Sequence, residues 1–168
     1  RDARRTSFDS TAEEPSFSVE DFIVQEDNHV LLSADGWVKR QKEIKDPSAT
    51  RLREGDRVLA CVVGSTRSSV VFFSSFGTAY TCRLADLPAT TGYGEPIQKL
   101  FKLRDGEAIV AALSLDPRVV GDVAELEGHY PETFAVAATT DGYAFTFGLS
   151  SFAEPSTRSG RRFAKPAA

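Results

Sequence analysis

The chain has 168 residues, of which 41% are hydrophobic, and a formal net charge of −4. This length suits one soluble domain with an ordinary core. The sequence contains no apolar run near the roughly 18 to 20 residues that a membrane-spanning helix needs. The first residue is arginine and methionine is absent, so we interpret the sequence as an interior piece of a longer polypeptide.

The acidic charge is concentrated at the start of the chain. The first 26 residues hold seven acidic and three basic side chains, whereas the remaining residues hold seventeen of each. Residues 1–21 are rich in Ser, Thr, Glu and Arg and show no apolar periodicity, which predicts a linker or disordered tail. The folded part is expected to cover residues 22–168.

From residue 22 onward the sequence indicates β-structure almost throughout. Short runs rich in Val, Phe, Tyr and Thr, separated by Gly, Asp and Pro, predict strands. In chain order these runs are residues 22–25, 29–34, 37–41, 57–63, 69–75, 78–84, 108–115, 133–140 and 143–149. No long amphipathic helix is indicated, so the predicted fold class is all-β.

Three of the predicted hairpins share one pattern. An apolar strand is followed by Ser or Thr three residues before a glycine, and then by a strand that contains an aromatic residue. The copies are "VLLSADGWVKRQ" (30–41), "VFFSSFGTAYTC" (71–82) and "VAATTDGYAFTF" (136–147). A glycine at each turn permits the positive φ that tight hairpins require. We therefore predict equivalent turns at Gly36, Gly77 and Gly142.

A second motif alternates with the hairpin, as "LREGDRVLACVV" (52–63) and "LRDGEAIVAALS" (103–114). Two motifs in the same order indicate a tandem repeat of propeller blades or a related array, because one small sheet cannot bury both of its faces. The alternative is a sandwich of unrelated hairpins. The predicted blade units are residues 28–66, 67–131 and 132–168, about two and a half to three blades.

Several stretches together resemble the C-terminal domain of the A subunit of bacterial type IIA DNA topoisomerases, DNA gyrase and topoisomerase IV. They are "DGWVKRQ" (35–41), "LREGDRVLACVVGSTRSSVVFFSSFGTAYTCRLADLP" (52–88) and "GYGEPIQKLFKLRDGEAIVAALSL" (92–115). The resemblance implies a β-pinwheel, a propeller-like ring whose neighbouring blades exchange strands and whose basic rim binds and bends duplex DNA.

The gyrase branch of this family carries a basic, glycine-rich box, typically "QRRGGKG", after the first hairpin. Here that place holds "KEIKDPSATRLREGD" (42–56), which has no glycine pair. The resemblance therefore favours a topoisomerase IV-like protein that bends DNA without strong chiral wrapping. The stretch "SGRRFAK" (159–165) is a partial echo of the box at another blade.

DNA binding needs cations along a curved surface, because phosphate contacts and counterion release supply most of the affinity. Arg83, Lys99 and Lys102 are weaker candidates, since Asp86 and Glu95 dilute the local field. The alternative for any single cation is a solvated surface residue. The predicted DNA-binding residues are Lys39, Arg40, Lys42, Lys45, Arg51 and Arg53 in the first unit and Arg158, Arg161, Arg162 and Lys165 in the last.

No catalytic constellation or metal-ligand spacing stands out, so the chain is expected to be non-catalytic by itself and to need no cofactor. The partners implied by the resemblance are double-stranded DNA, the ATPase B subunit, and the rest of the A subunit. The implied location is cytoplasmic and nucleoid-associated. The parent enzyme would be an ATP-dependent topoisomerase, an isomerase. A rival interpretation is a propeller-type protein-interaction module that does not bind DNA.

Overall fold

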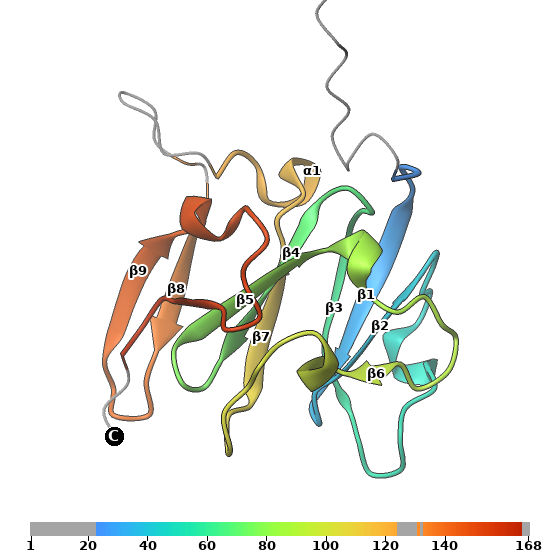
Figure 1. Ribbon diagram of the computed structural model, residues 1–168, viewed down its shortest axis with the longest axis horizontal. Coiled ribbons are helices and arrows are strands. Elements are labelled where there is room, and N and C mark those ends of the chain that lie inside the picture. The colour runs from blue at the N-terminus through green and yellow to red at the C-terminus, as the bar shows by residue number, and fades with distance from the viewer. Residues whose placement is uncertain (1–22, 124–130, 132, 166–168) are drawn as a thin grey trace, which may run out of the picture.

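The computed structural model describes residues 23–123, 131 and 133–165. Their strands are joined by tight turns, longer loops and single-turn helices (Figure 1). The only α-helix in these ranges, α1 (Pro117–Val120), has four residues, which confirms the all-β class. The predicted tail at residues 1–21 lies outside the described residues. The strands are β1 (Asp27–Ser33), β2 (Trp37–Gln41), β3 (Val58–Ser65), β4 (Ser69–Ser74), β5 (Thr78–Arg83), β6 (Glu95–Pro96), β7 (Ile109–Ser114), β8 (Phe134–Ala138), β9 (Ala144–Gly148) and β10 (Arg161–Arg162).

The strand prediction was wrong at the start of the folded part and at the shortest strands. Residues 23–26 form no strand, although residues 22–25 were predicted as one. Their carbonyls instead hold the turn after β3, because Val24 O accepts the hydroxyl of Thr66 and Ile23 O accepts Nε of Arg67. The two-residue strands β6 and β10 were missed, since so short a pairing leaves no periodic pattern.

The three predicted hairpin turns are equivalent, as the repeat indicated. The turn glycines Gly36, Gly77 and Gly142 have φ values of 78°, 74° and 86°. Each glycine N–H donates to the carbonyl of the Ser or Thr three residues earlier, whose hydroxyl accepts the N–H that follows the glycine. These bonds join Gly36 and Trp37 to Ser33, Gly77 and Thr78 to Ser74, and Gly142 and Tyr143 to Thr139.

Neighbouring sheets exchange strands, as the family resemblance implied. The first sheet has the order β3-β1-β2-β6 and the second β10-β5-β4-β7. The chain therefore leaves the first sheet for β4 and β5, returns to it as β6, and re-enters the second as β7. The predicted units 28–66, 67–131 and 132–168 do not coincide with the sheets, because β6 and β10 each complete the sheet of the preceding unit.

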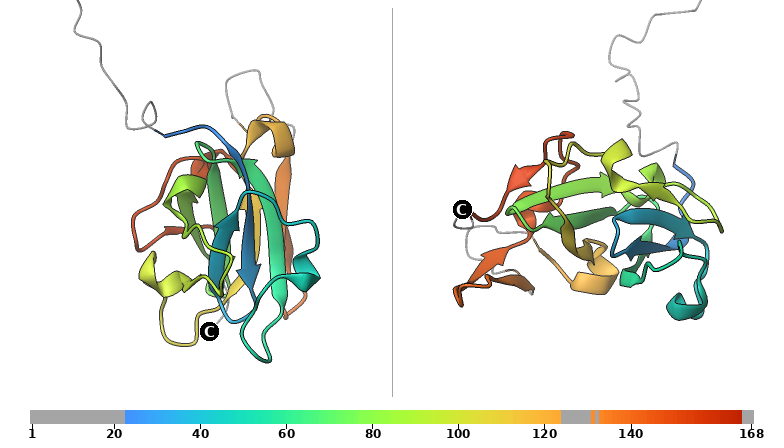
Figure 2. Two further views of the ribbon diagram at one scale, coloured as in Figure 1. Left: turned by 90° about the vertical axis from the view of Figure 1, so that its right-hand side faces the viewer. Right: turned by 90° about the horizontal axis from the view of Figure 1, so that it is seen from below.

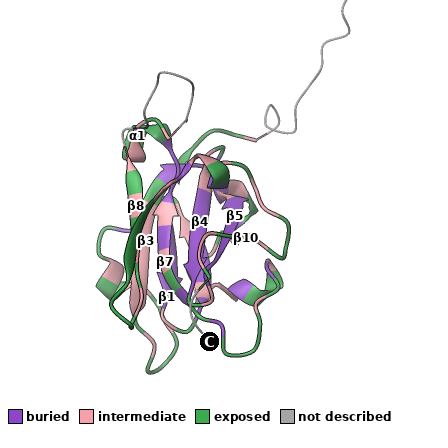
Figure 3. Cartoon of the chain, turned by 90° about the vertical axis from the view of Figure 1, so that its left-hand side faces the viewer, coloured by how far each residue is buried: buried purple, intermediate pink, exposed green. Residues whose placement is uncertain are grey.

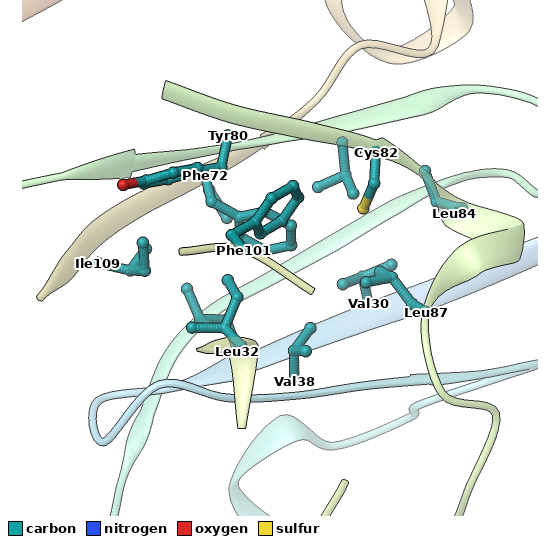
Figure 4. Close-up of a cluster of buried hydrophobic side chains, with 13 residues drawn as sticks. Val30, Leu32, Val38, Phe72, Tyr80, Cys82, Leu84, Leu87, Phe101 and Ile109 are labelled. Atoms are coloured by element: carbon teal, nitrogen blue, oxygen red, sulfur yellow. The ribbon is translucent and has the colours of Figure 1, made fainter. Parts of the chain in front are cut away.

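The hydrophobic core lies between the blades and is supplied by the period-2 alternation of the strands. On β4, Val70 and Phe72 face the first sheet, while Val71 and Phe73 face the third hairpin. Both faces of the second sheet are thus covered. Figure 4 shows the larger cluster between the first two sheets. Its buried members are Val30, Leu32, Val38, Val70, Phe72, Tyr80, Cys82, Leu84, Leu87, Ile97, Phe101, Ile109 and Ala112.

The third hairpin, β8 and β9, forms a separate two-stranded sheet. Phe147 of β9 packs edge-on against Phe73 of β4, with ring centroids 5.7 Å apart. The other face of the hairpin is open, since Val136 of β8 is 70% exposed. In Figure 3, β8 alternates between exposed (green) and intermediate (pink) residues, whereas β4 and β5 are mostly buried (purple). Within the described ranges β8 pairs only with β9, so its other edge is unpaired there.

A buried carboxylate joins the first two blades. Asp116, which is 1% exposed, caps α1 and accepts the N–H of Ser65 at the end of β3. Its side chain also accepts Nη2 of Arg118 at 2.7 Å, and Arg118 bridges onward to Asp27 at the start of β1. The hydrogen bonds from Arg118 and the Ser65 N–H outweigh burial and hold the pKa of Asp116 well below its usual range.

We expect Asp116→Asn to lower the free energy of unfolding by about 2 kcal/mol at pH 7, because an amide cannot accept all of these bonds. The folded protein binds a proton at Asp116 less readily than the unfolded chain, whose aspartate titrates at about pH 4. The stabilisation is therefore complete above that pH and is lost as the pH falls further. Urea unfolding of both proteins from pH 7 to pH 3 measures this. A difference that does not shrink toward pH 3 would contradict the assignment.

Candidate nucleic-acid interface

The segments that contain β6 and β10 are equivalent parts of successive repeats. Trp37 pairs with Pro96 in the first sheet, and Thr78 pairs with Arg162 in the second. The following residue donates its N–H to the carbonyl of the hairpin glycine in both cases, at 2.9 Å: Ile97 to Gly36 and Phe163 to Gly77. Residues 92–99 therefore align with residues 158–165. Figure 2 (left) shows both segments on one side of the molecule and β3 and β7 on the other.

A glycine lets each segment approach its sheet closely. Gly94 and Gly160 have φ values of 89° and 68°. A Cβ on Gly94 would collide with the carbonyl of Val38, and one on Gly160 would lie 2.7 Å from the carbonyl oxygen of Ala79. The two glycines hold the segments against the sheets, so the side chains that follow them are presented on a common scaffold.

The charge on this scaffold differs sharply between the two blades. Residues 92–99 contain one acidic and one basic side chain, Glu95 and Lys99, which form an ion pair at 3.0 Å. Residues 158–165 contain four cations and no acid. Arg161 occupies the position equivalent to Glu95, and Lys165 matches Lys99. The repeat thus replaces a neutral segment by one of charge +4.

The four cations of residues 158–165 divide into two pairs. Arg158 donates to the carbonyls of Lys99 and Leu100, and Arg161 to those of Ser151, Glu154 and Pro155. These two side chains hold residues 158–165 against neighbouring backbone carbonyls, and their positive charge remains. Arg162 and Lys165 are exposed, and neither side chain has a hydrogen-bond or ion-pair partner within the part of the chain that the structure describes.

Lys39 is wrongly placed in the predicted DNA-contact set. Its side chain is 0% exposed, and its ammonium donates to the carbonyls of Arg51 and Gly92 at 2.7 and 2.8 Å. Burial lowers the pKa of Lys39. Arg40 also serves the fold, because its guanidinium binds the carbonyls of Leu87 and Ala85 and the side chain of Asn28. The sequence could not show that these strand positions face a neighbouring loop.

The other predicted cations of the first unit are exposed. Lys42 and Lys45 follow β2, and Arg51 and Arg53 precede the second-motif glycine. The Arg53 guanidinium lies 4.8 Å from the centroid of the Trp37 ring, and that of Arg51 lies 5.0 Å from the ring of Tyr93. Stacking on an aromatic ring orients a guanidinium without removing its charge. The structure therefore leaves these four residues available as candidates.

Arg104 was not among the predicted DNA-binding residues, although it is equivalent to Arg53 when Gly55 is aligned with Gly106. The same alignment places Lys102, considered only a weak candidate, on Arg51. Lys99, also considered a weak candidate for DNA contact, forms an ion pair with Glu95.

Among the described residues there is no cluster of three His, Cys, Asp or Glu side chains that could hold a metal ion. No helix in those residues is long and apolar enough to cross a bilayer.

Comparison with known proteins agrees with a propeller-like repeat fold. The family described as "DNA gyrase C-terminal domain, beta-propeller" matches residues 68–116. The chain is 34% identical over 94 residues to the A subunit of DNA topoisomerase 4 from Caulobacter vibrioides, covering 55% of this chain and 12% of the relative. It is 30% identical over 156 residues to the A subunit of DNA gyrase from Haemophilus influenzae, covering 86% of this chain and 16% of the relative. The chain thus spans less than a fifth of either relative.

Among solved structures, the C-terminal domain of E. coli ParC superposes with a TM-score of 0.64 at 26% identity, covering 81% of this chain and 50% of that domain. A C-terminal domain of DNA topoisomerase IV superposes with a TM-score of 0.62 at 18% identity, covering 83% and 42%. The strand-exchanged sheets and these likenesses define a β-pinwheel repeat domain. The chain belongs to the family of C-terminal domains of gyrase and topoisomerase IV A subunits.

Proposed function

We propose that this chain binds and bends duplex DNA as an accessory domain of the A subunit of a type IIA topoisomerase. The observation that carries the proposal is the charge of residues 158–165. They occupy the same scaffold as residues 92–99 but replace Glu95 by Arg161 and add Arg158 and Arg162. Like charges held this close repel one another unless a polyanion compensates them. Duplex DNA supplies such a polyanion without any need for base-specific contacts.

Bending follows from the arrangement of the blades. Successive sheets present equivalent exposed segments on one side of the molecule (Figure 2), and a duplex held at more than one of them must follow their curve. Phosphate contacts then offset the elastic cost of the bend. Because the segment 42–56 lacks a basic glycine-rich box, we expect bending without a large, sign-specific change in linking number.

The partners we propose are double-stranded DNA, the ATPase B subunit, and the remainder of the A subunit, in the bacterial cytoplasm at the nucleoid. The ATP-dependent strand passage belongs to the whole enzyme. This chain would contribute by holding a flanking or transported duplex, which affects the choice among relaxation, supercoiling and decatenation.

We expect the double variant Arg162→Ala/Lys165→Ala to weaken duplex binding equally across sequences. Each lost phosphate contact should flatten the slope of log affinity against log salt by about 0.9, hence by about 1.8 for both. These two positions are chosen because neither side chain supports the fold in the described structure, whereas Arg158 and Arg161 hold backbone carbonyls. Fluorescence anisotropy of a duplex of about 30 bp across about 50 to 200 mM salt measures the slope.

The matched control is Lys99→Ala, the equivalent of Lys165 in the first blade. Lys99 is already paired with Glu95, so its loss should leave the slope nearly unchanged. Absence of salt-dependent duplex binding in the wild-type protein would favour a protein-interaction module instead. An unaltered slope in a folded Arg162/Lys165 variant would remove residues 158–165 from the interface.

A further inference from the structure

The two second-motif loops present the same pair of cations in successive blades. Both loops turn at a glycine of positive φ, 81° at Gly55 and 77° at Gly106. The residue after each glycine donates its N–H to the carbonyl two residues before the glycine, at 3.1 Å in both loops. The repeat therefore matches Arg51 with Lys102 and Arg53 with Arg104, all of them at least partly exposed.

The acid that follows each glycine is turned toward the hairpin turn of its own blade, although Glu107 still interacts electrostatically with Arg104. In the first blade Asp56 accepts the N–H of Asp35 next to the hairpin turn. In the second blade Glu107, 8% exposed, accepts the hydroxyls of Ser74 and Tyr80. The remaining acids of the loops, Glu54 and Asp105, are exposed at the tips. Each loop thus offers two cations against one exposed carboxylate.

The second-blade loop borders a polar hollow of about 440 Å³ next to residues 158–165. The N–H of Lys102 donates to the carbonyl of Arg158 at 2.7 Å, which joins the loop to that segment. The hollow thus lies between two sources of positive charge, and the Ser159 hydroxyl borders it as a hydrogen-bond donor, whereas the Tyr80 hydroxyl already donates to Glu107. Its lining residues are Thr78, Tyr80, Lys102, Leu103, Arg104, Asp105 and Ser159.

The corresponding place in the first blade is occupied by aromatic rings. Trp37 matches Thr78 and Tyr93 matches Ser159, and these two rings carry the guanidinium groups of Arg53 and Arg51. Buried Lys39 donates to the carbonyls of both Arg51 and Gly92, so it holds the backbone of the Arg51 loop next to the segment that carries Tyr93. The first blade therefore holds two oriented guanidinium groups where the second holds a hollow.

We propose that the two loops are phosphodiester-binding sites, one per blade, in which Lys102, Arg104 and Ser159 form the second-blade site and Arg51 and Arg53 the first. This inference rests on the proposed DNA-binding function and extends it, because it adds a second row of contacts beside residues 158–165. The ligand class is a phosphate group of a nucleic-acid backbone, since rigid guanidinium groups and hydroxyl donors match its oxygens.

The test compares two double variants, Arg51→Ala/Arg53→Ala and Lys102→Ala/Arg104→Ala. Each should flatten the salt slope of duplex binding by about 1.8, and the quadruple variant by about 3.6. Trp37 is the only tryptophan of the chain and lies under Arg53, so it reports on the first blade separately. Duplex binding should protect Trp37 from acrylamide quenching in the wild-type protein and in the Lys102/Arg104 variant, but not in the Arg51/Arg53 variant.

The control Arg67→Ala/Lys99→Ala removes the same charge elsewhere and should leave the slope nearly unchanged. Asp105→Asn should strengthen binding, because it removes the exposed carboxylate beside the hollow. Circular dichroism verifies that each variant is folded. Steep salt dependence in the wild type together with unchanged slopes in both double variants would overturn this inference and leave the proposed function standing. No salt-dependent binding in the wild type would overturn both.

Discussion

Replacing Gly94 by alanine should lower the free energy of unfolding by about 3 kcal/mol or more, from backbone strain and overpacking together. Gly94 has a φ of 89°, which alanine adopts only with strain. A Cβ there would also meet the carbonyl of Val38, with the carbonyl carbon at 2.9 Å. Backbone atoms of β2 cannot move aside without breaking the sheet, so we expect β6 to detach from the first blade.

Two other glycines separate the cost of backbone strain from the cost of overpacking. Gly55 has a φ of 81° but nothing within 4 Å of an added Cβ, so Gly55→Ala should cost only the strain, about 1 kcal/mol. Gly92 lies outside the positive-φ region and a Cβ would meet only the Thr90 hydroxyl at 3.3 Å, so Gly92→Ala should be nearly neutral. Urea unfolding gives the three values. Equal losses at Gly55 and Gly94 would show that the close approach to Val38 is unimportant.

Replacing Glu107 by alanine should cost about 3 kcal/mol, because buried donors would lose their acceptor at about 1 to 3 kcal/mol each. Glu107 accepts the hydroxyls of Ser74 and Tyr80 and the N–H of Arg104. Burial alone would raise its pKa, but these bonds outweigh it and hold the pKa below the usual value. Burial and the nearby carboxylate raise the pKa of Tyr80 to about 12, so its hydroxyl remains a donor at neutral pH.

Tyr80→Phe removes one donor but leaves the carboxylate bound to two others, and should cost only about 1 kcal/mol. Asp56→Ala is the matched change in the first blade, where the carboxylate is only partly buried, and should cost less than Glu107→Ala. Thermal and urea unfolding measure all three variants. A Glu107→Ala protein as stable as Tyr80→Phe would show that water satisfies the orphaned hydroxyls.

The repeat could be predicted from the sequence because its determinants are local. A hairpin with Ser or Thr three residues before a glycine fixes its own turn, and all three turns form as expected at Gly36, Gly77 and Gly142. The acid after the second-motif glycine was visible in the alignment as Asp56 and Glu107, but its role was not. Only the structure shows it bound to the Ser33 or Ser74 turn of its own blade.

The candidate interface was predicted only in part. The cationic stretch at residues 158–165 was apparent from composition, and exposed Arg51 and Arg53 agree with the expectation of surface cations. From the sequence alone, Lys39 was predicted to be a surface cation like its neighbours. Its burial against the carbonyls of Arg51 and Gly92 depends on a loop about fifty residues away, which no local pattern encodes.

What the sequence alone determined is thus the all-β class, the repeating hairpin and the family, since strand alternation and turn chemistry act over a few residues and recur in each copy. The tertiary structure decided which sheet each short strand joins, and with it which cations are exposed. The exchanged strands β6 and β10 have only two residues each, so their partners are set by long-range packing at Gly94 and Gly160 rather than by propensity. That packing buries Lys39, ties down Arg158 and Arg161, and leaves Arg162 and Lys165 facing solvent.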